Sequence, residues 1–319
     1  MIKKQNSIKR VLRNFVLFPC LVLFVLVNSI IAIQANRMMY FGDNPQKLPR
    51  KTKEQITTSE KFFGLSQLKR AVNDNFSVPH ETVNLTSEGF KLESWYAHQD
   101  TIARGFVLLF HGFGSSKDEC SLSATFFFNQ GYDVLLTDFR AHGNSSGNES
   151  MAGYVESPDV VAAYRFAESK GAKTIMMWGV SMGAATILNA VAHYDLKPKK
   201  IFLDCPYSTF LDATKGFLRL VHAPETPFSQ MLMFWGSVEK GVWAFNNAPK
   251  EFAKMIKVPT LLMRGRKDVR VTAAETEAIF QNLATPDKQL VFFEDSPHGA
   301  LIKFEKDKWE STVKAFLDK

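Results

Sequence analysis

The segment 179–183, Gly-Val-Ser-Met-Gly, places a serine between two closely spaced glycines. An apolar run precedes the segment, and a run of small residues typical of a helix follows it. The pattern predicts a strand, a sharp turn and a helix, with Ser181 at the apex of the turn. Side chains at positions 179 and 183 would collide with such a turn, which explains both glycines. A hydroxyl held at a helix N-terminus is placed to act as a nucleophile; the alternative is a glycine-rich turn with an inert serine.

An activated serine needs a base, a group that orients the base, and hydrogen-bond donors for the oxyanion. Asp268 and His298 each follow a predicted strand, so the chain order is Ser, Asp, His. The C-terminal ends of parallel strands meet at one edge of a sheet, where we expect these side chains to lie close to Ser181. The backbone N–H groups of Met182 and Phe113 are the predicted oxyanion donors.

Strand and helix patterns alternate along residues 81–319, which predicts a mostly parallel, eight-stranded α/β sheet with helices on both faces. The first two strands form a hairpin that supplies an antiparallel edge. The predicted strands are 81–86, 90–98, 105–110, 133–137, 174–178, 200–204, 260–264 and 289–293. The predicted helices are 122–129, 158–169, 184–190, 273–282 and 306–317.

The interval between the strands ending near 204 and starting near 260 is longer than one crossover helix requires. We therefore predict a small helical cap over the C-terminal edge of the sheet, at about residues 206–250. Many of its residues are aromatic or aliphatic, which suits a lining for acyl or aromatic groups. The alternative is that most of them pack the cap onto the core.

The positive charge of the chain is confined to its N-terminal arm. Residues 1–70 hold thirteen Lys and Arg against three Asp and Glu, whereas the remaining residues hold twenty-six against twenty-nine. The folded part is therefore nearly neutral, which argues against nucleic-acid binding. The whole chain has 45% hydrophobic residues, and the part after the N-terminal arm is long enough for one large domain.

A basic segment, 1–14, precedes a charge-free run at 15–33. Nineteen helical residues span roughly 28 Å, about the hydrocarbon thickness of a bilayer. We predict a single-pass membrane anchor with a cytoplasmic N-terminus and the catalytic part on the outer (periplasmic or extracellular) side. The alternative is a signal peptide, and cleavage of residues 1–35 would yield a secreted protein. Residues 34–80 are interpreted as an irregular linker or stalk.

With these blocks in place, the chain resembles the α/β-hydrolase family over residues 81–319. It is most similar to the branch with serine aminopeptidase-like, monoacylglycerol-lipase-like and small membrane-anchored hydrolases. Where this chain has Ala141, the family usually has glycine. Some relatives carry the acid at the position of Asp204, and His111 and His142 are alternatives to His298 as the base. The matching blocks are 111–114, 138–145, 179–183, 265–268 and 297–299.

The resemblance implies a cofactor-independent serine hydrolase that cleaves a carboxylic ester, of short or medium acyl chain or derived from a lipid, through an acyl-enzyme. Ser181, His298 and Asp268 would form the triad, supported by the elbow and loop glycines Gly112, Gly179 and Gly183. A peptidase, thioesterase or acyltransferase would fit the same triad. A membrane-tethered binding protein with an idle serine is a further alternative.

Neither metal ligands nor a disulfide are predicted. No Cys/His cluster has the spacing of a metal site. Cys120 and Cys205 are expected on elements about 9–10 Å apart, too far for a bridge, so both thiols are expected to be free.

Overall fold

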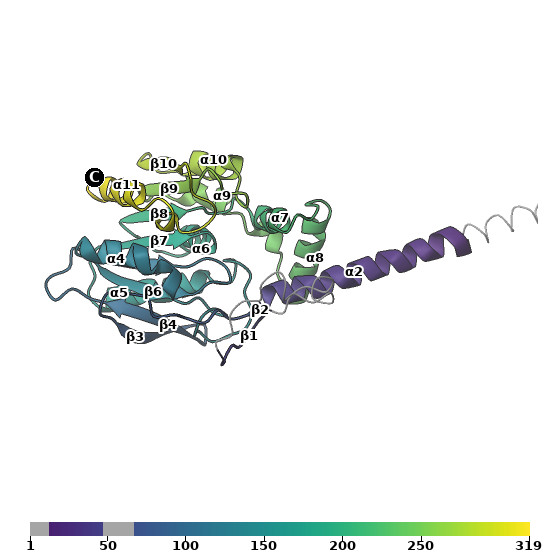
Figure 1. The fold of residues 1–319 in the computed structure, drawn as a ribbon, viewed down its shortest axis with the longest axis horizontal. Helices are drawn as coiled ribbons and strands as arrows, with labels where there is room; N and C mark the ends of the chain where they lie inside the picture. Colours follow the sequence, from purple (N-terminus) through teal and green to yellow (C-terminus); the bar gives the residue numbers. More distant parts are fainter. Residues whose placement is uncertain (1–12, 47–66) are drawn as a thin grey trace, which may run out of the picture.

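The computed structural model describes residues 13–46 and 67–319, and an eight-stranded sheet forms its centre (Figure 1). The strand order is β10-β9-β8-β7-β5-β6-β4-β3. Strand β4 runs antiparallel to both of its neighbours, and all other pairs are parallel. The predicted fold class, a mostly parallel sheet of eight strands, is therefore confirmed. The strands are β3 Glu81–Ser87, β4 Phe90–Ala97, β5 Phe106–Phe110, β6 Asp133–Thr137, β7 Ile175–Val180, β8 Lys200–Asp204, β9 Thr260–Gly265 and β10 Lys288–Phe293.

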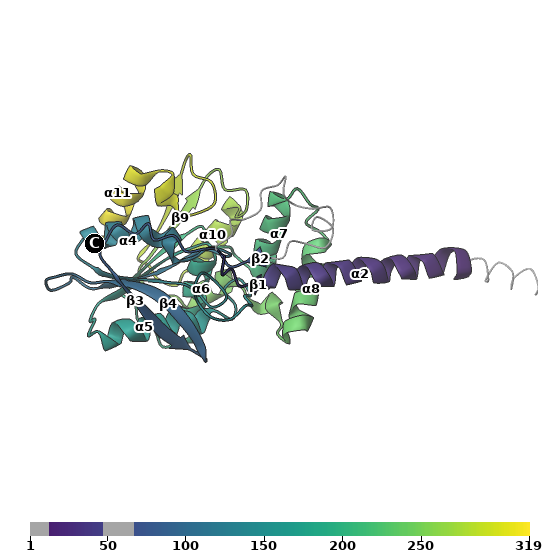
Figure 2. The ribbon, with the colours of Figure 1, turned by 60° about the horizontal axis from the view of Figure 1, so that its bottom comes forward.

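The antiparallel edge is a tight hairpin between β3 and β4. Ser87 pairs with Phe90, so the loop contains only Glu88 and Gly89. Both loop residues have positive φ, 47° and 83°, as a type I′ turn requires. Figure 2 shows this hairpin at the edge of the domain. The central strand β5, by contrast, is buried along its whole length, as expected for a parallel strand covered on both faces.

Helices cover both faces of the sheet, as the sequence predicts. Helices α4 and α11 pack on one face through aromatic residues that include Phe127, Trp309 and Phe316. Helices α5, α6 and α10 pack on the other face through smaller aliphatic residues. The helices are α4 Ser121–Asn129, α5 Ser157–Ser169, α6 Met182–His193, α10 Ala273–Asn282 and α11 Lys306–Leu317.

Between β8 and β9 the chain forms a helical insertion beyond the carboxyl ends of the strands, and its two main helices lie within the interval 206–250 (Figure 1). Its two main helices are α7 (Phe210–Leu220) and α8 (Phe228–Lys240). Two short turns, η4 (Ala244–Asn246) and η5 (Ala253–Met255), flank the one-turn helix α9 (Pro249–Phe252) before the chain enters β9.

The N-terminal apolar run forms one long helix, α2 (Phe18–Met39), preceded by the turn η1 (Arg13–Leu17). The helix continues to Met39, so the prediction of an irregular linker from residue 34 was wrong at residues 34–39. Its C-terminal part packs against α8, and its N-terminal part projects from the domain (Figures 1 and 2). Most of the predicted basic segment and of the linker, residues 1–12 and 47–66, lies outside the described residues.

The segments before and after residues 47–66 form a small parallel ladder. Strand β1 (Phe41–Gly42) pairs with β2 (Gln67–Leu68), and Lys69 Nζ forms an ion pair with Asp43 at 2.9 Å. Residues 41–42 and 67–68 are therefore ordered parts of the domain, which the sequence did not predict.

Candidate active site

Ser181 sits in the strained turn that the sequence predicts between β7 and α6. Its φ is 52° and its ψ is −112°, a conformation that L-residues rarely adopt. A Cβ on Gly183 would lie 2.3 Å from the carbonyl oxygen of Phe110, and one on Gly179 would lie 2.6 Å from the carbonyl carbon of Gly183. The predicted crowding thus accounts for both elbow glycines. At Gly112 the nearest atom would be 3.5 Å away, so steric crowding does not explain that glycine.

The structure brings Ser181, His298 and Asp268 together in one hydrogen-bonded chain. The Ser181 hydroxyl lies 2.8 Å from His298 Nε2, and His298 Nδ1–H donates to Asp268 Oδ2 at 2.7 Å. The other carboxylate oxygen, Oδ1, accepts from the N–H groups of Arg270 and Val271 at 2.8 and 2.9 Å. Burial would raise the pKa of Asp268, but the bond from His298 and these N–H groups lower it below its usual value. The carboxylate is therefore ionised and holds the imidazole in the tautomer that leaves Nε2 free to accept a proton.

Asp204, the alternative acid, is engaged elsewhere. Its buried carboxylate accepts hydrogen bonds from the Leu301 N–H at 3.1 Å and from Trp309 Nε1–H at 3.3 Å. Burial raises the pKa of Asp204 to about 7. These contacts attach the loop after His298 and helix α11 to the end of β8. The Asp204 side chain therefore supports the loop that follows His298.

Because the folded pKa of Asp204 lies above the unfolded value of about 4, its protonated form stabilises the fold at low pH. That contribution is lost as the pH rises through about 7. The amide of Asp204→Asn does not ionise, so we expect the variant not to lose stability over this pH range as the wild type does. The free energy of unfolding of the variant, relative to the wild type, should then rise by roughly 3 kcal/mol between pH 5 and pH 8. Urea unfolding of the detergent-solubilised full chain at both pH values measures it.

The surface variant Asp195→Asn is the control, and its effect should stay within about 0.5 kcal/mol at both pH values. An Asp204→Asn difference that is the same at pH 5 and pH 8 would contradict a buried, protonated carboxyl at this position.

His111 and His142, the alternative bases, hold loops in place through hydrogen bonds. His111 Nδ1 lies 2.7 Å from the Gly112 carbonyl, and its Nε2 accepts the Phe139 N–H at 3.2 Å. His142 Nδ1 lies 2.9 Å from the Arg140 carbonyl. Burial lowers the pKa of His111 to about 4 and that of His142 to about 3, so both rings are neutral at physiological pH.

The predicted oxyanion loop lies against Ser181, since a Cβ on Gly112 would be 3.7 Å from the Ser181 Cβ. A partly buried carboxylate missed by the sequence reasoning, Glu119, holds this loop by accepting the Gly112 N–H at 3.0 Å. Burial would raise the pKa of Glu119, but the charge of Lys303 and the Gly112 N–H lower it. Met182 begins helix α6, so its N–H belongs to the unsatisfied first turn, where an anion is favoured.

Residues just after helix α2 also contact this loop. The Phe41 side chain, 1% exposed, packs edge-on against Phe113 with the ring centroids 5.2 Å apart. The Phe41 N–H donates to the Asn148 carbonyl at 2.7 Å, and the Ser150 N–H donates to the Met39 carbonyl at 2.9 Å. Nothing in the sequence pattern of a basic, polar stretch indicates this docking.

A mostly apolar pocket opens at Ser181, and it contains both predicted oxyanion residues. Helices α7 and α8 of the insertion line it through Phe217 and Leu232 among others. Helix α2 also lines it, which the sequence did not predict. The α2 residues in the pocket wall are Ala35, Met38 and Met39.

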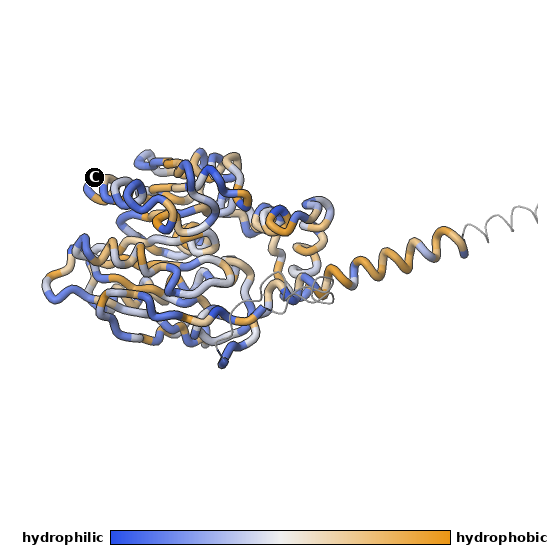
Figure 3. Tube along the Cα trace, in the orientation of Figure 1, coloured by the Kyte–Doolittle hydropathy of each residue, from blue (hydrophilic) through white to orange (hydrophobic). Residues whose placement is uncertain are grey.

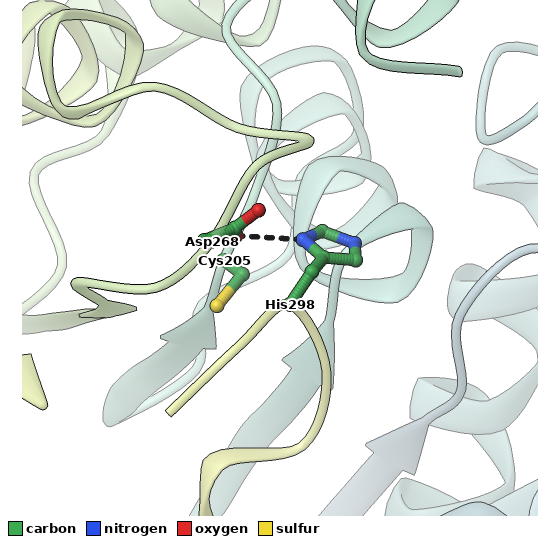
Figure 4. Close-up of side chains that lie close together, drawn as sticks. All are labelled: Cys205, Asp268 and His298. Atoms are coloured by element: carbon green, nitrogen blue, oxygen red, sulfur yellow. Dashed lines mark hydrogen bonds and ion pairs between the residues drawn. The ribbon is translucent and has the colours of Figure 1, made fainter. Parts of the chain in front are cut away.

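Figure 4 shows Cys205 beside the hydrogen-bonded Asp268 and His298. Their ligand atoms lie within 4.8 Å of one another, which is the spacing of a possible metal site. However, the Asp268 carboxylate already receives three hydrogen bonds, and burial raises the pKa of the Cys205 thiol well above its usual value. A neutral thiol is a poor metal ligand, so the group is better suited to orienting His298. Cys205 and Cys120 are both buried and free, as predicted.

Comparisons with known proteins agree with this architecture. A family model described as alpha/beta hydrolase fold matches residues 105–226. The esterase Pf2001 of Pyrococcus furiosus superposes with a TM-score of 0.64 at 25% sequence identity, covering 78% of this chain and 97% of that one. The chain has the α/β-hydrolase fold.

Two proteins of Bacillus subtilis (strain 168) are also similar to this chain. A carboxylesterase is 22% identical over 228 residues, which cover 67% of this chain and 92% of the relative. The protein YqkD is 24% identical over 306 residues, which cover 92% of this chain and 94% of its own length. The similarity to YqkD therefore extends beyond the hydrolase domain alone.

Proposed function

We propose that the protein is a serine hydrolase that cleaves carboxylic esters with Ser181 as nucleophile. The observation that carries this proposal is the continuous chain of hydrogen bonds from Ser181 through His298 to Asp268, at the mouth of an apolar pocket. The similarity to a carboxylesterase and to an esterase of the same fold supports the reaction class.

The geometry suits acyl transfer in two steps. His298 Nε2 takes the proton of the Ser181 hydroxyl as the oxygen attacks the ester carbonyl, and Asp268 stabilises the imidazolium that forms. The N–H groups of Met182 and Phe113 hold the oxyanion, each contributing roughly 3 kcal/mol to lowering the barrier. His298 returns the proton to the leaving alcohol. Water then attacks the acyl-enzyme in the same way, releasing the carboxylic acid and restoring Ser181.

The pocket favours an ester over a peptide with a free amine. A peptidase of that kind needs a carboxylate facing the substrate, and Glu225 and Glu239 of the insertion are the candidates. Glu225 pairs with Arg219 at 3.1 Å, whereas Glu239 accepts from the Asn36 side chain. Both are thus engaged outside the apolar lining around Ser181, which suits an acyl group.

We further propose that α2 is a retained membrane anchor and not a cleaved signal peptide. Residues 14–39 form one helix long and apolar enough to cross a membrane, and most of it is exposed (Figure 3). Cleavage after Ala35 would cut this helix inside the part that packs on α8 and lines the pocket. Retention keeps that contact intact, and the basic N-terminal segment favours a cytoplasmic N-terminus with the hydrolase domain outside.

The test is labelling of the detergent-solubilised full chain with a fluorophosphonate probe, together with hydrolysis of p-nitrophenyl butyrate. We expect the wild type to be labelled and active, and Ser181→Ala to lose both properties. Ser150→Ala is the matched control, because Ser150 is another serine in the same pocket and its hydroxyl bonds to Glu156 at 2.5 Å. A folded wild type that is not labelled would favour a binding protein with an idle serine.

A further inference from the structure

The inference rests on the proposed function and concerns how its substrate arrives. Residues 14–26, which run from the turn η1 into the first nine residues of α2, are exposed throughout, and none of them belongs to an apolar cluster of the domain. Thirteen helical residues rise about 20 Å, whereas the hydrocarbon core of a bilayer is about 30 Å thick. The exposed part of α2 is thus about 10 Å too short to span a membrane by itself.

The next residues of α2 supply the missing length, and they already lie against α7 and α8. Val27 and Ile31 pack with Leu218, Leu232 and neighbouring apolar side chains of the insertion. Asn28, one of two polar residues in this stretch, is satisfied there, because its Oδ1 accepts Trp235 Nε1–H at 3.1 Å and its amide donates to the Phe24 carbonyl at 2.9 Å. A helix that spans the bilayer therefore brings α7 and α8 to the membrane surface.

The surfaces of α7 and α8 are suited to that position. Helix α8 crosses α2, and α7 packs on α8, on the side of the domain from which the free part of α2 projects (Figures 1 and 2). Five large apolar side chains at these two helices are between 36% and 55% exposed, where a wholly aqueous surface would favour polar residues. Interfacial helices commonly bury such side chains about 5–10 Å into the boundary of the acyl chains. The five residues are Leu220, Val221, Phe228, Phe234 and Val238.

The pocket lies next to the exposed apolar surface of α7 and α8, on the side that faces away from the membrane. Along α2, its lining residues Ala35 and Met39 are about 3 and 9 Å beyond Ile33, the last residue of the predicted membrane anchor. The same pocket contains Ser181. Apolar side chains of α2, α7 and α8 therefore form walls of the pocket that contains the nucleophile.

We propose that this pocket takes the acyl chain of a lipid ester directly from the bilayer, with the C-terminal end of α2 as one of its walls. The acyl chain moves along the apolar contact between α2 and the two insertion helices without crossing water. Ser181 then cleaves the ester, and the products are the fatty acid and the deacylated lipid alcohol. Helix α2 thereby serves both as the anchor and as part of the acyl site.

The experiment compares two ways of supplying one substrate, dipalmitoylglycerol, to the full chain reconstituted in phosphatidylcholine vesicles. In one arm the substrate is in the same vesicles as the protein, and in the other it is in separate vesicles. Lateral entry predicts at least about tenfold faster release of palmitate when both share a membrane. Equal rates would show delivery through water and overturn the proposal.

Two substitutions test the pocket wall formed by α2 and the exposed apolar surface of α7 and α8. We expect Met38→Trp, which narrows the pocket from α2, to slow palmitate release about tenfold more than it slows butyrate ester hydrolysis. Leu26→Trp, on the exposed part of the same helix, is the matched control. Val238→Glu should slow only palmitate release, and its control is Ile102→Glu, an exposed apolar residue near the opposite, amino-terminal ends of the strands.

The remaining outcomes are distinct. Butyrate hydrolysis that depends on Ser181, without palmitate release in either arm, would leave the proposed function standing and overturn the lipid substrate. Loss of both activities in Met38→Trp would show that α2 is a scaffold and not an acyl wall. A dimer in detergent that Val238→Glu converts to a monomer would make the exposed surface a contact between two copies, which also overturns the proposal. Absence of butyrate hydrolysis in the wild type would contradict the proposed function itself.

Discussion

Replacing Asp268 by Asn is expected to lower kcat/KM for p-nitrophenyl butyrate by about 10³- to 10⁴-fold, with the fold intact. Asp268 accepts His298 Nδ1–H at 2.7 Å and two backbone N–H groups on its other oxygen. An Asn oxygen can keep the backbone contacts, but its NH₂ group would then face Nδ1. The imidazole would then adopt the tautomer in which Nδ1 is unprotonated and accepts from Asn, and Nε2 carries the proton. A protonated Nε2 cannot take the proton of Ser181, so the base is lost.

The matched control for this change is Asp204→Asn, because both carboxylates follow a strand and the sequence leaves both open as the acid. Asp204 contacts Leu301 and Trp309 instead of the imidazole, so we expect its variant to retain kcat/KM within about fivefold. Steady-state kinetics on both variants at pH 8 makes the comparison. A large loss in Asp204→Asn and a small one in Asp268→Asn would reverse the assignment of the acid.

The arrangement around Ser181 could be predicted because each structural requirement is local and selects a recognisable residue type or pattern in the sequence. Close approach of backbone at positions 179 and 183 demands glycine, and the alternation of strand and helix patterns fixes which strand ends share an edge. Several predicted elements, among them β6, β8, α10 and α11, have the observed bounds. Ala141 shows the limit of such rules, because it adopts a φ of 63°, where glycine is the usual residue.

The contributions of α2 could not be predicted, because they depend on contacts between distant segments. An apolar run of this length has the same composition whether it is surrounded by lipid or packs on a neighbouring helix. Phe41 and Met39 therefore gave no signal that they would pack beside Phe113 and in the pocket wall. Glu119 was missed for a related reason, since a single Glu after a glycine-rich loop does not show which N–H it will accept.

Asp138, the first residue of the matching block 138–145, has a charged partner that the sequence did not reveal. Lys117 is completely buried, and its Nζ lies 2.6 Å from Asp138 Oδ2 and 2.9 Å from Glu93 Oε1. The backbone N–H of Lys117 also donates to Asp138 Oδ1 at 2.6 Å, and Asp138 Oδ2 accepts the backbone N–H of Asn144 at 2.9 Å. The pair thus joins the loop that carries the predicted oxyanion donor Phe113 to the end of β6.

Lys117→Met is expected to lower the free energy of unfolding by about 3–5 kcal/mol, because it leaves a buried carboxylate without its counter-ion. Burial raises the pKa of Asp138, so this carboxylate depends on Lys117 to remain charged. Urea unfolding of the detergent-solubilised full chain measures the loss. The control is Lys254→Met, whose side chain is 58% exposed and pairs with Glu251, and whose cost should stay below about 1 kcal/mol.

The double variant Lys117→Met with Asp138→Asn separates the charge from the packing. If the unpaired carboxylate causes the loss, the double variant should be more stable than the sum of the two single changes predicts, by about 1–3 kcal/mol. Strict additivity would show that the ammonium and the carboxylate act independently. A Lys117→Met loss no larger than that of Lys254→Met would mean that the oxyanion loop does not depend on this buried pair for its attachment to the sheet.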